Sequence, residues 1–267
     1  MPKNKERELI DILINLEPAI KKAGILALKM QKNITVSKKL NTGIYGVDIV
    51  TEADLKVQEM ILSEFAKTEL NQCRMAAEEN TPSINKFKNK NGFILCLDPI
   101  DGTVFYSSKK KFFSIIVSLI NKKDILYTYN YFPALKWGYR ILGDNVKNFG
   151  KLPKLPTKIK NTSKIIVHWF RDSKEIDFNT FLKLTNKGYT FSTMRDVTDY
   201  SGACTLFYLN KVAGFFTTNP NLYDGLVGLH YAKAKKFKII STIDMSKSPK
   251  HGPRGFYYPG WYIVLRK

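Results

Sequence analysis

Apolar residues at helical spacing dominate the N-terminal part of the chain. Leu9, Leu13 and Leu16 lie three or four positions apart, and a similar spacing resumes after Pro18. Proline lacks the amide hydrogen that a helix interior uses, but it fits the first turn of a helix. We therefore expect two helical stretches over residues 7–32, with Pro18 opening the second.

A third helix is predicted after Thr51. Thr51 and Asp54 have the spacing of a capping box, and Val57, Ile61 and Phe65 continue a buried helical face.

Short apolar runs in the middle of the chain are typical of buried strands. We predict strands over residues 93–97, 114–120, 125–131 and 137–142. The segment 148–164 combines Gly, Pro and many Lys, and is the best candidate for a linker. Beyond it we expect strands near residues 165–168, 212–216, 237–241 and 262–265, with helices over 178–184 and 226–234.

This order of elements predicts a mixed α/β (α+β) chain with a seam near residue 150. We accordingly expect an N-terminal α+β domain over residues 1–150 and a C-terminal α/β domain over residues 151–267.

Composition narrows the possible partners. Lys and Arg number 43 against 23 acidic residues, a net charge of +20, which favours an anionic partner. However, only seven of the 43 are Arg, and surfaces that read nucleic-acid bases favour Arg. We therefore expect the charge to steer small phosphorylated anions toward the protein, and nucleic acid is disfavoured as a partner.

Cysteine and histidine chemistry is not expected. The three cysteines and three histidines are scattered, which argues against a disulfide framework or a zinc site. No run approaches the length of a membrane span, and polar residues interrupt the N-terminus too early for a signal peptide. We expect a cytoplasmic protein whose chemistry depends on Asp, Glu, Ser and Thr.

The most informative stretch is LCLDPIDGTVFY (95–106), where a buried strand ends in Asp98 and Asp101. Pro99 predicts a turn that brings both carboxylates to one point, and the amides of Gly102 and Thr103 can face an anion. At about 4 Å and an effective dielectric near 20, the two charges repel by roughly 4 kcal/mol. A divalent cation would reverse that sign, and ligands that are all oxygen favour Mg²⁺. The alternative is an ordinary surface Asp-Pro turn, but the end of an apolar strand favours a functional site.

The motif DPIDGT (98–103), together with DIVTEAD (48–54), AEEN (77–80) and NLYDGLVGLHYAKA (221–234), resembles the inositol monophosphatase family of lithium-sensitive, magnesium-dependent phosphatases. The resemblance covers most of the chain. It implies a layered α-β-α-β-α sandwich of the sugar-phosphatase type, with the site between the two halves. It also implies two or three Mg²⁺ ions, held by Glu78, Asp98, the Ile100 carbonyl, Asp101 and Asp224, with the Thr103 hydroxyl as a further candidate.

The catalytic roles that the resemblance implies fall on Asp48, Thr103 and Glu78. Asp48 and Thr103 would form a hydrogen-bonded pair that orients the attacking water and helps to deprotonate it. The amides of Gly102 and Thr103 would bind the substrate phosphate. For Asp54 we favour a helix cap over a catalytic role.

The expected leaving-group pocket departs from the family pattern. Counting back from Asp224 without a gap places Arg195 on the family's Arg, Tyr200 on a usually small residue and Thr217 on the Glu that meets inositol hydroxyls. If the loop shifts, Ser201–Gly202–Ala203 would take the place of the family's small-residue triplet. We therefore expect a substrate other than inositol monophosphate.

These observations predict a Mg²⁺-dependent phosphomonoesterase that hydrolyses a small phosphorylated polyol or sugar with metal-activated water. One alternative is a 3'(2'),5'-bisphosphate nucleotidase. A second is a regulator of the same family that associates with RNA or RNA polymerase. Because the family is often dimeric, a homodimer is also expected, although no feature of the sequence itself indicates one.

Overall fold

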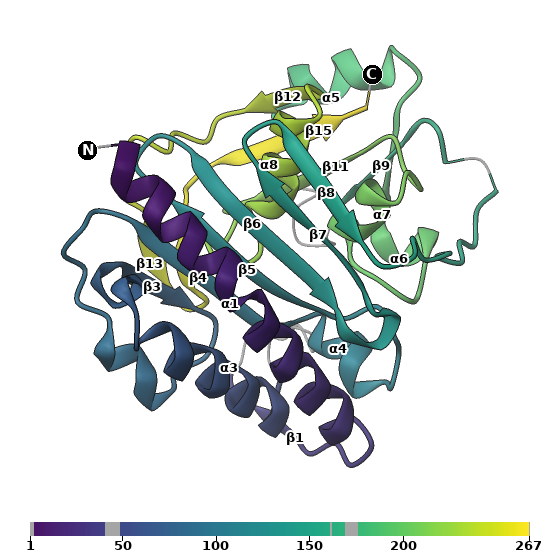
Figure 1. Cartoon of the computed structure of the whole chain (residues 1–267). Helices are drawn as coiled ribbons and strands as arrows, with labels where there is room; N and C mark the ends of the chain where they lie inside the picture. Colours follow the sequence, from purple (N-terminus) through teal and green to yellow (C-terminus); the bar gives the residue numbers. More distant parts are fainter. Residues whose placement is uncertain (1–2, 41–48, 161, 169–175, 267) are drawn as a thin grey trace.

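The computed structural model describes residues 3–40, 49–160, 162–168 and 176–266. Helices and sheets alternate in five layers (Figure 1). Helices α1 (Lys3–Met30) and α3 (Glu52–Phe65) cover one face of a six-stranded sheet. Helices α7 (Ala203–Tyr208) and α8 (Val227–Ala234) separate this sheet from a five-stranded one. Helix α5 (Phe178–Thr185) packs on the outer face of the second sheet, so the predicted α-β-α-β-α layering is confirmed.

One correction concerns the first helix, which continues through Pro18 instead of dividing there. Pro18 is exposed, whereas Leu13 and Ile20 on either side of it are fully buried. Packing of this continuous apolar face outweighs the local cost of the proline. Thr51 and Asp54 form the predicted capping box at the start of α3.

The first sheet has the strand order β3-β4-β5-β6-β7-β8, with β3 parallel to β4 and all other pairs antiparallel. Its strands are Arg74–Ala77, Ile94–Asp101, Ser114–Ile120, Ile125–Phe132, Trp137–Leu142 and Asn145–Phe149. Four of them were expected from the apolar runs. Strands β3 and β8 were missed because each is short and one, β8, is largely exposed. A two-stranded ribbon, β1 (Val36–Lys38) with β2 (Ile49–Thr51), lies outside this sheet.

The second sheet has the order β10-β9-β11-β15-β12. Its strands are Thr190–Thr193, Ile165–His168, Gly214–Thr218, Trp261–Leu265 and Lys238–Ser241. Strand β10 and three short helices, α4 (Thr103–Ser107), α6 (Met194–Val197) and α7, were not predicted as such. The hairpin of β13 (Lys250–Gly252) and β14 (Gly255–Tyr257) was not predicted either. The hairpin lies outside both large sheets, against the loop that precedes α8.

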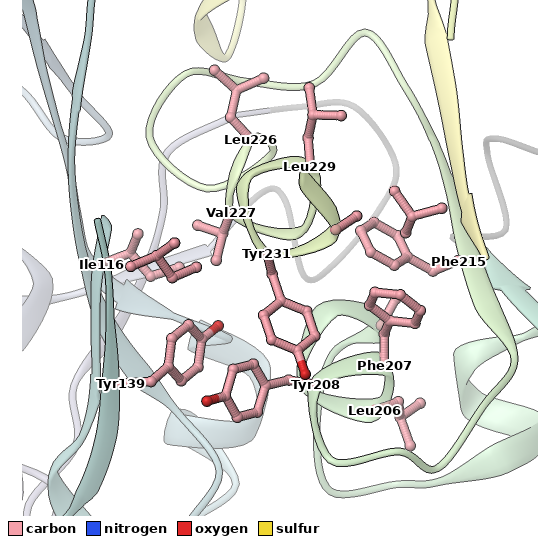
Figure 2. Packing of buried hydrophobic residues seen from close by; sticks show 14 of the residues in the cluster. Ile116, Tyr139, Leu206, Phe207, Tyr208, Phe215, Leu226, Val227, Leu229 and Tyr231 are labelled. Atoms are coloured by element: carbon pink, nitrogen blue, oxygen red, sulfur yellow. The ribbon is translucent and has the colours of Figure 1, made fainter. Parts of the chain in front are cut away.

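Aromatic side chains join the two halves of the chain (Figure 2). Tyr139 of the first sheet stacks on Tyr208 of α7, with ring centroids 3.8 Å apart, and Tyr231 of α8 lies against Tyr208 at 4.5 Å. One hydrophobic cluster thus takes residues from both sides of residue 150. The division into two domains at that residue stays a prediction.

In the described part of the chain, no helix has the length and apolar character needed to cross a lipid bilayer. Cys73, Cys96 and Cys204 are free thiols.

Candidate active site

A β-bulge brings Asp98 and Asp101 to the same side of the sheet. In a regular strand, residues three positions apart face opposite sides. Asp98 pairs with Ile116 and Asp101 with Ser114, so three steps along β4 match two along β5, and the register shifts by one residue. The strand therefore continues to Asp101, and the bulge, not the expected turn at Pro99, turns both carboxylates toward one point.

Asp224 joins these two carboxylates from the other half of the chain. Oxygen atoms of Asp98, Asp101 and Asp224 all lie within 4.8 Å of one another. Asp224 lies in the loop before α8, which is fixed by a 3.0 Å hydrogen bond from the Gly225 amide to the Asn221 carbonyl. Tyr262 of β15 also donates a 2.6 Å hydrogen bond to the Gly225 carbonyl. The second sheet thus anchors the loop that supplies the third carboxylate.

Glu78 connects this cluster to a second acidic group. Its amide donates a 3.0 Å hydrogen bond to the Leu97 carbonyl, which holds it beside the strand that carries Asp98. Carboxylate oxygens of Asp54, Glu78 and Glu79 also lie within 4.8 Å of one another. Lys39 lies 2.8 Å from Glu78 and also pairs with Glu79, which is buried. Six carboxylates therefore gather from four segments of the chain.

The electrostatics of the three-aspartate cluster favour a bound cation. Burial raises the pKa of Asp98 well above its ordinary value, and the charges of Glu78, Asp101 and Asp224 raise it further. Burial and Asp224 together raise the pKa of Asp101 to about 7, against the opposing hydrogen bond from Ser114. A divalent cation would relieve this repulsion, and the all-oxygen donor set fits Mg²⁺.

Cys204 lies close by but does not change that chemistry. Burial and the nearby Asp101 raise the pKa of its thiol to about 12, so it stays protonated at neutral pH.

The segment after the bulge has a tightly bonded backbone. The amide of Ile100 donates a 2.9 Å hydrogen bond to Asp98 Oδ1, and the Thr103 hydroxyl lies 3.3 Å from the Ile100 carbonyl. Gly102 has φ +86°, the left-handed conformation that glycine adopts without strain, and it caps α4. The predicted partner of Thr103, Asp48, lies outside the described residues.

Asp54 is positioned as a cap. Its Oδ2 accepts a 2.8 Å hydrogen bond from the Thr51 amide at the start of α3. Burial and Glu78 raise its pKa to about 7.

A cavity of about 90 Å³ opens beside the three aspartates. Among the described residues, its lining includes Asp101, Asp224 and the predicted Thr217, together with Gly202 and Ala203. Gly202 and Ala203 belong to the Ser201–Gly202–Ala203 segment of the shifted-loop alternative, which stays a prediction.

The other two predicted substrate contacts lie elsewhere. Arg195 is exposed on α6, and Tyr200 is 43% exposed; neither is among the described residues that line this cavity. The ammonium of Lys110 instead lies 4.6 Å from the centre of the Tyr200 ring.

Arg254, at the tip of the β13–β14 hairpin, also lines the cavity. The sequence reasoning missed it, because the only element expected in the C-terminal segment was a strand near residues 262–265. Its only local signal was the Gly-Pro-Arg-Gly turn over residues 252–255.

A model of the inositol monophosphatase family matches residues 8–219. The chain belongs to this family. Comparison with curated protein sequences gave no significant match. Among solved structures, the chain is similar to a staphylococcal inositol monophosphatase complexed with products, at 19% identity and a TM-score of 0.63, covering 97% of this chain and 91% of that one.

Two other solved structures extend the comparison. An enzyme described as an inositol monophosphatase/NADP phosphatase, complexed with Mg²⁺ and phosphate, is 17% identical with a TM-score of 0.64, covering 98% of this chain and 92% of that one. The suhB extragenic suppressor protein of Bartonella henselae is 15% identical with a TM-score of 0.62, covering 96% of this chain and 94% of that one. At these identities the structural likeness shows a shared fold.

Proposed function

We propose that this protein is a Mg²⁺-dependent phosphatase that hydrolyses a small phosphorylated polyol or sugar. The observation that carries the proposal is the convergence of Asp98, Asp101 and Asp224 within 4.8 Å, although the chain separates the first two from the third by more than a hundred residues. Membership of the inositol monophosphatase family supports the same activity.

Each acidic residue has a proposed role in the Mg²⁺ centre. Glu78, Asp98 and the Ile100 carbonyl would hold one ion, and Asp98, Asp101 and Asp224 a second. Bound Mg²⁺ would neutralise the phosphate, lower the pKa of the attacking water and stabilise the leaving oxygen.

The protein's own groups would position the substrate. The amides of Gly102 and Thr103, at the left-handed start of α4, would bind the phosphate oxygens. The Thr103 hydroxyl, held near the Ile100 carbonyl, would orient the attacking water, with Asp48 as its proposed partner. The cavity lined by Gly202, Ala203 and Thr217 would receive the leaving group.

The uncharged part of the cavity wall, formed by Gly202, Ala203 and Thr217, supports a substrate other than inositol monophosphate. Thr217 offers a hydroxyl where an acidic side chain would accept hydrogen bonds from several polyol hydroxyls. An aromatic residue at the cavity would suit a nucleotide, but Tyr200 is exposed outside the described lining, so it gives the nucleotidase alternative no support. The regulatory alternative depends on the net charge alone, and both stay predictions, as do the homodimer and lithium sensitivity.

The test is a substrate panel with purified protein. Inositol monophosphates, sugar phosphates and 3'-phosphonucleotides would be assayed with Mg²⁺, with EDTA and with added Li⁺. We expect Mg²⁺-dependent release of phosphate from a sugar or polyol phosphate, abolished in Asp98→Asn. The matched control is Asp144→Asn, which removes an exposed carboxylate far from the cluster in sequence and should keep full activity. If wild-type protein hydrolyses no monoester, the proposed function is wrong.

A further inference from the structure

The β13–β14 hairpin is fixed to the loop that carries Asp224. The Leu222 amide donates a 2.9 Å hydrogen bond to the Phe256 carbonyl, and Asn221 pairs with Tyr257 as an antiparallel bridge. The amide of Tyr258, a residue that is 1% exposed, donates a 3.2 Å hydrogen bond to the Pro220 carbonyl. Backbone bonds along both segments therefore hold the hairpin in one orientation.

The same hairpin contacts the strand that leads to Glu78. The guanidinium of Arg74, at the start of β3, lies 3.9 Å from the centre of the Phe256 ring. The hairpin is thereby held between the segment that supplies Glu78 and the loop that supplies Asp224. Gly252 pairs with Gly255, so the tip is a tight two-residue connection of Pro253 and Arg254. Gly255, directly after this connection, has φ +82°, which glycine adopts without strain.

Arg254 extends from this tip to the wall of the cavity. Of the described residues that line the cavity, it is the only basic one, and two others, Asp101 and Asp224, are proposed Mg²⁺ ligands. Burial opposes its charge, but Tyr223, Asp224 and Glu78 outweigh burial and raise the pKa of the guanidinium above its ordinary value. Because a guanidinium stays protonated at any physiological pH, Arg254 is a permanent cation at the edge of the acidic cluster.

A permanent cation beside ligands for divalent ions favours the binding of an anion between them. When Mg²⁺ neutralises Asp224 and Glu78, the guanidinium and the ions repel one another unless negative charge lies between them. A phosphoryl group supplies that charge, and the planar fork of arginine matches two phosphate oxygens.

We propose that Arg254 binds the phosphoryl oxygens of the substrate, and those of the inorganic phosphate released from it. The inference rests on the proposed function, since it takes the acidic cluster as the Mg²⁺ centre. The phosphate would then be bound by the Arg254 side chain, from a hairpin near the C-terminus, in addition to the backbone amides of Gly102 and Thr103. The competing role, in which Arg254 only holds Glu78 and Asp224 in position for Mg²⁺, predicts a different result.

The experiment measures two affinities by calorimetry, that of Mg²⁺ alone and that of inorganic phosphate at saturating Mg²⁺. Three variants are compared with wild type: Arg254→Gln, Arg254→Lys and Lys250→Gln. Lys250 is exposed on the same hairpin, so its replacement removes one positive charge without touching the cavity. Thermal melting of each variant checks that it is folded.

We expect Arg254→Gln to weaken phosphate binding by about ten- to a hundredfold, the usual effect of losing a charge-assisted hydrogen bond. Arg254→Lys should restore part of the affinity because it keeps the charge and loses the fork. Lys250→Gln should bind phosphate as wild type does. The affinity for Mg²⁺ alone should be unchanged or higher in Arg254→Gln, because a nearby cation has been removed.

Three results would overturn the inference. The first is wild-type phosphate affinity in Arg254→Gln, and the second is no phosphate binding by the wild type. The third is a roughly tenfold loss of Mg²⁺ affinity in Arg254→Gln, as expected when a group that orients metal ligands is removed. Failure of the proposed function is distinguishable, since it would leave a wild type that binds Mg²⁺ and phosphate but hydrolyses no monoester.

Discussion

The hydroxyl of Ser114 donates a 2.9 Å hydrogen bond to Oδ2 of Asp101, its direct partner across strands β4 and β5. This pair is the first in register after the bulge that follows Asp98. The bond lowers the pKa of Asp101, whereas burial and Asp224 raise it. Ser114 therefore both orients this carboxylate and favours its charged form, the form that binds a cation.

Replacing Ser114 by Ala should weaken Mg²⁺ binding in a pH-dependent way. Loss of the hydrogen bond raises the pKa of Asp101, so protons compete better with the cation. At pH 7 the Mg²⁺ concentration for half-maximal activity should rise about three- to tenfold. The difference in Mg²⁺ requirement between Ser114→Ala and the wild type should narrow toward about pH 9, where Asp101 is ionised in both proteins.

The matched control is Ser118→Ala, which removes another buried hydroxyl from β5, one that bonds Thr128 instead of a carboxylate. Its requirement for Mg²⁺ should match the wild type at every pH. An Mg²⁺ profile for Ser114→Ala that does not change with pH would contradict the assigned role.

The metal-free protein should lose stability as the pH rises toward 8. The pKa values of Asp54 and Asp101 are raised to about 7 in the folded state, above the ordinary value of 3.8. Between about pH 4 and 7 the folded protein thus binds more protons than the unfolded chain. The stability that this extra protonation contributes is lost as the pH rises through 7. Thermal melting in EDTA should show a falling midpoint from pH 5 to pH 8.

Two further thermal unfolding experiments test why the midpoint falls as the pH rises. Added Mg²⁺ should restore the midpoint at pH 8 by binding the charged carboxylates. Asp101→Asn should flatten the decline, since it removes one of the titrating groups. A midpoint independent of pH in EDTA would contradict the assigned pKa shifts.

Replacing Asp224 by Asn should separate stability from metal binding. The substitution removes one of the negative charges that repel Asp98 and Asp101. The thermal unfolding midpoint of the metal-free protein at pH 8 should therefore rise, by about 2–4 °C for each kcal/mol of relieved repulsion. The stabilisation by Mg²⁺ should largely disappear, and activity should fall by about a thousandfold or more. A variant that keeps the Mg²⁺-dependent rise in midpoint would show that Asp224 is no ligand.

Thr217→Glu should shift substrate preference toward inositol monophosphate. Thr217 lies on β11, where it pairs with Tyr262 and lines the cavity. A carboxylate there would accept hydrogen bonds from polyol hydroxyls, and one or two such bonds correspond to about a tenfold gain in relative kcat/KM. The control Thr190→Glu places the same charge at the exposed first residue of the edge strand β10 and should leave the preference unchanged. A loss of activity on all substrates in equal measure would contradict the assignment of Thr217 to the leaving-group wall.

The local elements of this protein were largely readable from its sequence. The apolar runs at Ser114–Ile120 and Trp137–Leu142 form strands with the predicted bounds, and Thr51 caps α3 as expected. Such elements depend on the periodicity and capping of neighbouring residues, which a single sequence displays directly. The acidic motifs also indicated the proposed ligands, because their residue types and order are those of the family.

Other features were decided only by tertiary structure. The packing of a continuous apolar face carries α1 through Pro18, and the pairing of β4 with β5 places the bulge that turns Asp98 and Asp101 to one side. Likewise, the position of Arg254 at the cavity depends on how its hairpin docks against the loop before α8. These features arise from contacts between segments remote in sequence, whose free energy no local pattern records.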